Sequence, residues 1–108
     1  MKAILIATAL AALAAPAFAA GDPAKGEKDF GKCKACHSIV NGDEVIQKGG
    51  KTGPNLFGVV GRAAASEEGF KYGDGIKAAA EKGLVWDEEK IAVYVKDPTA
   101  FLSDFTGE

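Results

Sequence analysis

The pentapeptide Cys33-Lys34-Ala35-Cys36-His37 constrains the fold of this chain more strongly than any other feature of its sequence. It brings together the only two cysteines and the only histidine of the 108 residues. Large aliphatic side chains are sparse, whereas glycine occurs 14 times. A small chain of this kind buries a modest core and usually needs a covalent staple or a bound group to fold firmly. We therefore expect that stabilising group to be attached at the pentapeptide.

The spacing Cys-x-x-Cys-His is the signature of c-type haem attachment. Two thiols at this spacing, near a helix end, can each form a thioether with the same porphyrin, and the adjacent imidazole can ligate the iron. The sequence therefore predicts one covalently bound haem c, anchored by Cys33 and Cys36, with His37 as an axial iron ligand.

Three other interpretations of the two cysteines are possible. A thioredoxin-like Cys-x-x-Cys is expected beside a βαβ pattern, and no strand pattern flanks this motif. A structural zinc site takes four Cys or His ligands, and the chain has three such residues. A Cys33–Cys36 disulfide in a haem-free interaction domain stays open in an oxidising compartment, although the loop it closes is very short.

The first 19 residues have the pattern of a signal peptide. Lys2 gives a positive start, residues 3–13 are apolar or small apart from Thr8, and Ala17-Phe18-Ala19 fits a signal-peptidase site. The apolar run is shorter than the roughly 20 residues that a membrane-spanning helix requires. We expect cleavage after Ala19, export to the periplasm, and one domain formed by residues 20–108.

Charge is mildly acidic overall but unevenly distributed. The formal net charge is -2, which argues against a nucleic-acid partner. Residues 24–62 carry seven basic groups against four acidic ones, and residues 63–108 carry twice as many acidic as basic groups. Such a dipolar molecule can be steered towards a charged partner. Four lysines near the Cys-x-x-Cys-His motif are candidates for that docking face: Lys32, Lys34, Lys48 and Lys51.

The pattern along the chain predicts an all-α fold with long loops. Asp22 can cap a helix that begins at Pro23 and runs to about Ala35, and Gly26 on its apolar face indicates a second helix packed closely against it. Residues 38–62 show neither a helical nor a strand period, as expected of a loop that wraps a large rigid ligand. Further helices are predicted over 74–82 and from 88 to about 96, with one more turn over 99–103.

The segment Thr52-Gly53-Pro54-Asn55-Leu56 is the expected partner of His37. A ligating histidine usually donates its other ring N–H to a fixed acceptor. The Gly53-Pro54 pair forms a rigid turn, and the Pro54 carbonyl could be the acceptor for the His37 ring N–H. The same residues also fit an ordinary loop turn.

The order of these motifs resembles class I cytochrome c, particularly the bacterial cytochrome c2 group, which is similar to mitochondrial cytochrome c. The resemblance covers residues 23–108 and rests on the Cys-x-x-Cys-His motif, residues 52–56, Gly58-x-x-Gly61-Arg62, Phe70-x-Tyr72, Trp86, and Tyr94-x-x-x-Pro98. It implies short helices and long loops wrapped around one haem. It also implies a monomeric, non-enzymatic one-electron carrier between a cytochrome bc complex and a photosynthetic reaction centre or terminal oxidase.

The resemblance further implies roles for individual residues. Pro54 would accept the His37 hydrogen bond, and Leu56 would pack on the haem. Arg62, Tyr72 and Trp86 would contact the haem propionates, and Tyr94 would lie near the sixth iron ligand. From the residues alone, the three aromatics could equally be core side chains, and Arg62 could be a solvated surface charge.

One family feature has no counterpart in this sequence. The family takes its sixth iron ligand from a methionine beyond the segment matching residues 101–106, and then ends in a helix that crosses the first one. The only methionine here is Met1. We therefore expect the cytochrome domain to be incomplete at its C-terminus, without that final helix. The alternative function is a haem-based small-ligand-binding or catalytic module with an open sixth coordination site.

Overall fold

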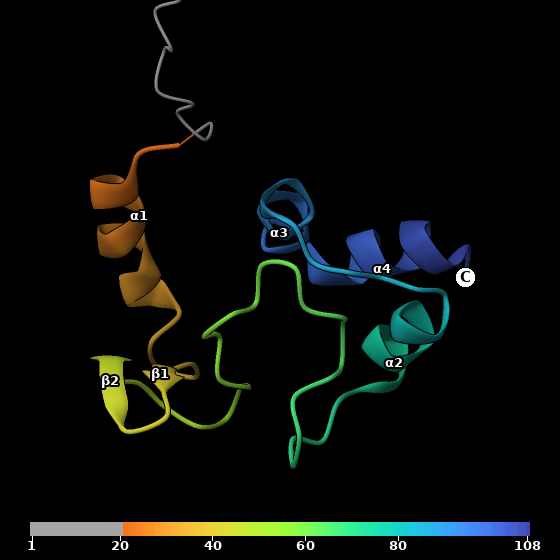
Figure 1. The fold of residues 1–108 in the computed structure, drawn as a ribbon. Helices are drawn as coiled ribbons and strands as arrows, with labels where there is room; N and C mark the ends of the chain where they lie inside the picture. Colours follow the sequence, from red (N-terminus) through yellow and green to blue (C-terminus); the bar gives the residue numbers. More distant parts are fainter. Residues whose placement is uncertain (1–20) are drawn as a thin grey trace, which may run out of the picture.

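The computed structural model describes residues 21–108, so the expected leader and its cleavage site lie outside the described residues. The chain is mostly helical with long connecting loops, as predicted (Figure 1). Its elements follow in the order α1 (Pro23–Asp29), η1 (Phe30–Lys32), β1 (Ile39–Asn41), β2 (Glu44–Gln47), α2 (Asp74–Glu81), α3 (Glu88–Tyr94) and α4 (Pro98–Thr106). No helix within this part of the chain combines the length and the apolarity needed to cross a membrane.

Helix α1 begins as predicted but ends early. The Asp22 carboxylate accepts hydrogen bonds from the backbone N–H groups of Ala24 and Lys25, at 3.0 and 3.3 Å, and Pro23 occupies the first turn. The prediction that this helix continues to about Ala35 was wrong. The chain tightens into the 3₁₀-helix η1 and then into turns, because successive N–H groups bond three residues back, as Cys33 does to Phe30 at 2.8 Å.

The helix expected against Gly26 is not found among residues 21–108. A side chain built on Gly26 would meet no atom within 4 Å. Helix α1 contacts only η1 among the other helices and strands described, and it lies on the opposite side of the long central loop from α2, α3 and α4 (Figure 1). The face of α1 that carries Gly26 and Phe30 is therefore unpartnered within the described segment.

A β-hairpin lies where the sequence predicted only loop. Strands β1 and β2 pair antiparallel, with Val40 opposite Val45 and Asn41 opposite Glu44. The two-residue connection begins with Gly42 at φ 58°, a left-handed conformation that glycine adopts without strain. A Gly-Asp pair between two apolar dipeptides is a known hairpin signal. The period-2 signal was absent because the strands are short and bury no face, with Val45 and Ile46 more than half exposed.

Aspartate caps position the two C-terminal helices. The Asp87 carboxylate accepts from the Lys90 N–H at 2.7 Å, and the Asp97 carboxylate accepts from the Ala100 N–H at 3.1 Å. Helix α3 begins and ends close to its predicted limits, and so does α2, although no side chain caps α2. Helix α4 is longer than the single turn predicted, because Phe101 and Phe105 pack toward the core along one of its faces.

The hydrophobic core is small and lies entirely in the C-terminal half of the chain. Only four apolar residues among those described are buried, namely Ala64, Ala79, Leu84 and Trp86. The Trp86 ring lies 4.7 Å from that of Tyr94 and 5.9 Å from that of Phe101, measured between centroids. So few buried side chains give little hydrophobic stabilisation for a domain of this size. The space that a larger core would fill is the cavity described next.

Candidate haem site

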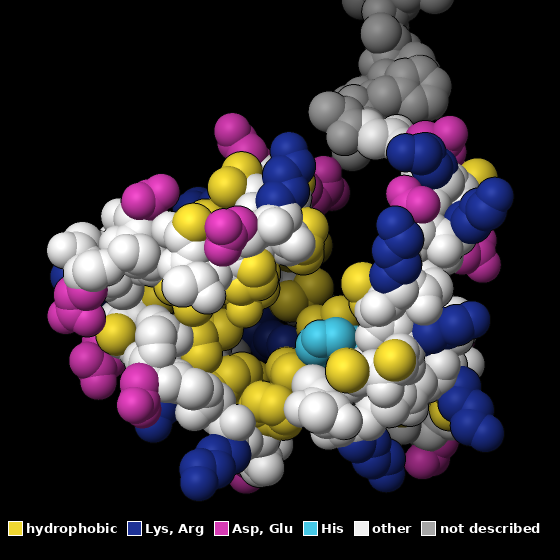
Figure 2. Space-filling view, turned by 180° about the vertical axis from the view of Figure 1, so that it is seen from behind, with side chains coloured by type: hydrophobic (Ala, Val, Ile, Leu, Met, Phe, Trp, Pro, Cys, Tyr) yellow, Lys and Arg dark blue, Asp and Glu magenta, His cyan; other side chains and the backbone are white. Residues whose placement is uncertain are grey.

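A largely apolar cavity of about 390 Å³ opens between the N-terminal half of the chain and the segment that carries helices α2 and α3. That volume lies in the range of small-molecule and cofactor sites. Figure 2 shows hydrophobic side chains gathered around the hollow, with the histidine at its rim. The cavity is lined by all the segments that the sequence singled out, through Cys33, His37, Gly53, Pro54, Leu56, Val59, Arg62, Ala63, Ala65, Phe70, Tyr72, Gly73, Ile76, Trp86, Ile91, Tyr94 and Val95.

The His37 ring is held by the backbone of the Gly53-Pro54 turn. Its Nδ1 lies 2.8 Å from the carbonyl oxygen of Pro54, so the predicted contact is present. A carbonyl can only accept a hydrogen bond, and Nδ1 must therefore carry the proton. The lone pair is then on Nε2, which is the tautomer that ligates a metal. The turn fixes both the orientation of the ring and the atom that it offers to a metal ion.

Gly53 permits this contact because it has no side chain. A Cβ at this position would lie 2.7 Å from Nδ1 of His37 and would overlap Cε1 of the same ring. The turn is anchored from both sides, because the Gly53 N–H donates to the Cys36 carbonyl at 2.7 Å and the Leu56 N–H donates to the Ser38 carbonyl at 3.0 Å. The loop thus lies directly on the backbone of the Cys-x-x-Cys-His motif.

Asn55 is a structural residue that the sequence analysis did not single out. Its side chain spans both backbone groups of Val40, with Oδ1 accepting from the N–H at 3.0 Å and Nδ2 donating to the carbonyl at 2.8 Å. Oδ1 also accepts from the Phe57 N–H at 3.1 Å. This amide joins the Pro54 turn to strand β1, which follows His37. Only the hairpin reveals this role, because Val40 is 15 residues away along the chain.

Replacement of Asn55 by alanine is expected to destabilise the folded protein by about 2–3 kcal/mol, because it leaves the N–H and the carbonyl of Val40 without partners. Urea unfolding of the parent and the variant would measure the difference. Gln47→Ala is a matched control, since the Gln47 amide makes only a local bond to Lys48. Equal midpoints for the two variants would contradict the structural role of Asn55.

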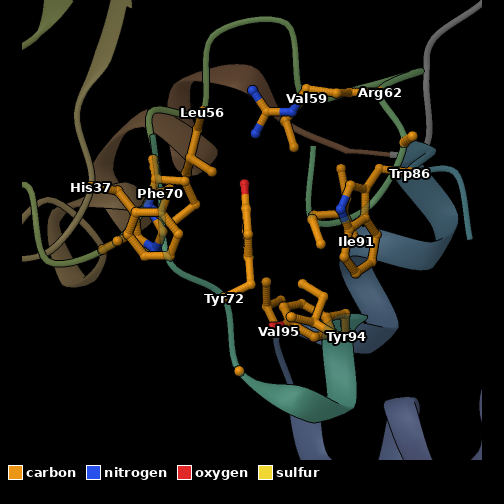
Figure 3. Close-up of a pocket in the computed structure, with 17 residues that line it drawn as sticks. His37, Leu56, Val59, Arg62, Phe70, Tyr72, Trp86, Ile91, Tyr94 and Val95 are labelled. Carbon is orange, nitrogen blue, oxygen red and sulfur yellow. The ribbon is translucent and has the colours of Figure 1, made fainter. Parts of the chain in front are cut away.

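Arg62 and Tyr72 bring polar groups to the cavity. Both terminal nitrogens of Arg62 donate to the Asn55 carbonyl at 3.1 Å, and Nη1 also lies 3.1 Å from Oε2 of Glu67. Tyr72 projects into the space between Leu56, Val59 and Ile91 (Figure 3). Arg62 is therefore held by specific partners rather than being a free surface charge, while its predicted contact with a haem propionate stays a prediction.

Trp86 and Tyr94 form the wall opposite His37 (Figure 3). The backbone of Trp86 pairs with the loop that carries Arg62, because the Trp86 N–H donates to the Arg62 carbonyl at 2.9 Å. The partial burial of Tyr94 raises the pKa of its hydroxyl above the usual value of 10.0. The two aromatics therefore pack in the core and also line the cavity, while their predicted places near the haem propionates and the sixth ligand stay predictions.

Tyr94→Phe is expected to reduce the loss of stability at alkaline pH. Because the folded pKa of Tyr94 is raised, its contribution is complete below the unfolded value of 10.0 and is lost as pH rises through the folded value. The parent should therefore show a fall in Tm above about pH 10 that is smaller in the variant. Parallel pH profiles for the two proteins would rule out this origin of the alkaline destabilisation.

The residues present fit a covalently bound haem. Cys33 and Cys36 are free, exposed thiols at the edge of the cavity region, and Cys33 lines the cavity itself. The imidazole offers Nε2, the walls are mostly apolar, and the few polar tips come from Arg62, Tyr72 and the aromatics. Because the protein core is small, the cavity walls are the main apolar surface that a bound haem would cover. The fold and the site together define a c-type haem protein.

Comparison with known proteins names the family. The chain is 59% identical over 108 residues to cytochrome c2 of Rhodobacter capsulatus, covering 96% of this chain and 77% of the relative. It is 57% identical over 113 residues to cytochrome c-550 of Paracoccus versutus, covering 100% of this chain and 73% of the relative. The X-ray structure of cytochrome c2 from Paracoccus denitrificans matches with a TM-score of 0.79 at 59% identity, covering 82% of this chain and 75% of that one. No family model matches.

The chain belongs to the cytochrome c2 and c-550 family. Members of this family carry one covalently bound haem c and transfer electrons rather than catalyse a reaction. The predicted fold, cofactor and non-enzymatic class are thereby confirmed. The comparisons favour an electron carrier over the ligand-binding or catalytic alternative.

The structure brings nearly all of the predicted site residues to one place. Eight of them line the cavity, namely Cys33, His37, Pro54, Leu56, Arg62, Tyr72, Trp86 and Tyr94. Cys36 is exposed and is not among the lining residues. The cavity also uses apolar residues that no motif marked, such as Val59, Ile76 and Ile91. Their signal is weak, because an isolated aliphatic residue in a loop or helix does not reveal which surface it faces.

Proposed function

We propose that this protein is a periplasmic one-electron carrier that takes electrons from a cytochrome bc complex and delivers them to a photosynthetic reaction centre or terminal oxidase. In this proposal residues 1–19 direct export and residues 20–108 form the cytochrome domain. The observation that carries the proposal is the 2.8 Å contact between His37 and the Pro54 carbonyl. It presents one metal-binding nitrogen at the rim of an apolar cavity, beside two free thiols.

Each proposed site residue has a defined task. Cys33 and Cys36 would hold the haem through thioether bonds, and His37 would ligate its iron. When bound, the haem supplies an iron that alternates between Fe(III) and Fe(II). The protein excludes water from it, because the surrounding side chains are largely apolar and their low dielectric helps to set the potential. Pro54 orients His37 and Leu56 packs on the haem, while Arg62, Tyr72, Trp86 and Tyr94 supply hydrogen-bonding groups around it.

The surface charge supports docking to acidic partners. In Figure 2, Lys and Arg side chains cluster on the side that carries α1 and the motif, whereas Asp and Glu side chains cluster on the side of the C-terminal helices. The proposed docking face consists of Lys32, Lys34, Lys48 and Lys51, all of them exposed. Complementary charges of this kind give fast association that weakens as salt screens them. The carrier would act as a monomer and form short-lived complexes.

The proposal is tested with protein expressed together with haem-maturation machinery. Mass spectrometry should show loss of residues 1–19 and the gain of one haem, roughly 600 Da. Stopped-flow reduction by a purified cytochrome bc complex should be fast at low salt and should slow as salt is raised. Lys34→Glu should slow this reduction further. Lys77→Glu, which makes the same charge change on α2 and away from the motif, is the matched control. A colourless product, or reduction that is independent of salt and of Lys34, would contradict the proposal.

A further inference from the structure

Arg62 and Tyr72 are both held by a residue that does not line the cavity. The carboxylate of Glu67 lies 3.1 Å from Nη1 of Arg62. The backbone N–H of Glu67 donates a hydrogen bond of 3.0 Å to the hydroxyl oxygen of Tyr72. Glu67 is thus connected to one cavity group through its side chain and to another through its backbone, although it is absent from the cavity wall itself.

The loop that carries Glu67 is held in place by tertiary contacts. The Gly61 N–H donates to the Trp86 carbonyl at 2.7 Å, and the Ala64 N–H donates to the Leu84 carbonyl at 2.9 Å. Ala65 then adopts a left-handed conformation with φ 54°, which costs a residue with a side chain about 1–2 kcal/mol. Strain of this kind persists where the surrounding contacts over-determine the backbone. The reversal at Ala65 returns the chain towards Arg62.

The contacts of Glu67 decide which way the two cavity groups point. Because the Tyr72 oxygen accepts from Glu67, the Tyr72 hydroxyl proton remains available for a different acceptor. Within residues 21–108 that hydroxyl donates no hydrogen bond to the protein, and it points into the cavity on the side where Arg62 lies (Figure 3). The guanidinium of Arg62, 19% exposed, is fixed between the Asn55 carbonyl and the Glu67 carboxylate.

Glu67 also determines the net charge of this end of the cavity. The Glu67 side chain is 34% exposed, so solvent screens its charge only in part. Paired with Arg62, it offsets the positive charge that would otherwise face the cavity. A negative charge close to the haem favours the oxidised iron, because the oxidised form carries one more positive charge.

We propose that Glu67 is a positioning residue that orients Arg62 and Tyr72 at the polar end of the cavity and lowers the reduction potential of the bound haem. This inference rests on the proposed electron-carrier function. It assigns a tuning role to a residue outside the cavity wall, in a loop that none of the attachment or ligand motifs includes.

Two Glu67 variants separate charge from positioning. Glu67→Gln removes the charge but keeps a side-chain oxygen for Arg62. At a fixed applied potential it should raise the ratio of reduced to oxidised protein roughly threefold. Glu67→Ala also removes that oxygen, so it should raise the ratio further and speed exchange of the Arg62 guanidinium protons measured by NMR. The shift in Glu67→Gln should shrink at high salt.

Glu68→Gln is the matched control, because it removes the same charge from the neighbouring, exposed residue. Its potential should stay close to that of the parent. Equal potentials in Glu67→Gln and Glu68→Gln, or unchanged Arg62 proton exchange in Glu67→Ala, would refute the inference while leaving the carrier function intact. A parent protein that takes up no haem would instead refute the proposed function, and this inference with it.

Discussion

His37→Gly protein, produced with haem-maturation machinery, is expected to lack the histidine-ligated haem spectrum of the parent. His37 is the only histidine in the chain, and its ring is the group that the Pro54 carbonyl holds at the cavity rim. Glycine removes the imidazole and leaves space where the ring lay. Imidazole added to the solution should therefore enter that space, bind the iron and restore the spectrum of the parent. A visible absorption titration with imidazole measures this rescue.

Lys34→Ala provides a control within the same pentapeptide. The backbone carbonyl of Lys34 accepts a hydrogen bond from the Gly50 N–H at 2.9 Å. The substitution keeps this contact, because it changes only the side chain. The spectrum of Lys34→Ala protein should match that of the parent both with and without added imidazole. A His37→Gly protein with a parental spectrum in the absence of imidazole would show that another residue ligates the iron.

Gly53→Ala should disrupt the site almost as severely as His37→Gly does. It replaces none of the residues that are expected to bond to the haem. The new Cβ would lie 2.7 Å from Nδ1 of His37, inside the contact distance of real side chains. The ring and the turn must separate, and the hydrogen bond between His37 and Pro54 should be lost. Overpacking of this kind costs about 1–3 kcal/mol, and loss of the orienting partner weakens a metal ligand roughly 10–100-fold.

Denaturant unfolding and the visible spectrum of the haem protein measure the two consequences of Gly53→Ala. Gly75→Ala in α2 is the matched control, because its Cβ would meet Leu102 at an ordinary 3.5 Å. That variant should be neutral or stabilised by up to about 1 kcal/mol, since alanine favours helix more than glycine does. A Gly53→Ala protein as stable as Gly75→Ala, with an unchanged spectrum, would show that the close approach at Gly53 does not matter.

Local rules account for the parts of the fold that the sequence predicted correctly. The starts of α1 and α3 follow from Asp22 and Asp87, because each aspartate caps N–H groups two or three residues further on. The rules failed where geometry depends on distant partners. The hairpin and the tightening of α1 into η1 carried little periodic signal, since their few side chains bury no common face.

By itself, the sequence determined the chemistry of this protein. The motif at residues 33–37 specifies both thiols and the imidazole, because covalent attachment and ligation require them at adjacent positions. Only the tertiary structure decided how the other groups meet that chemistry. The ring tautomer of His37, the anchoring role of Asn55 and the pairing of Glu67 with Arg62 depend on contacts between separate segments. Spacing along the chain cannot encode those contacts, because the backbone turns that create them are set by packing across the whole domain.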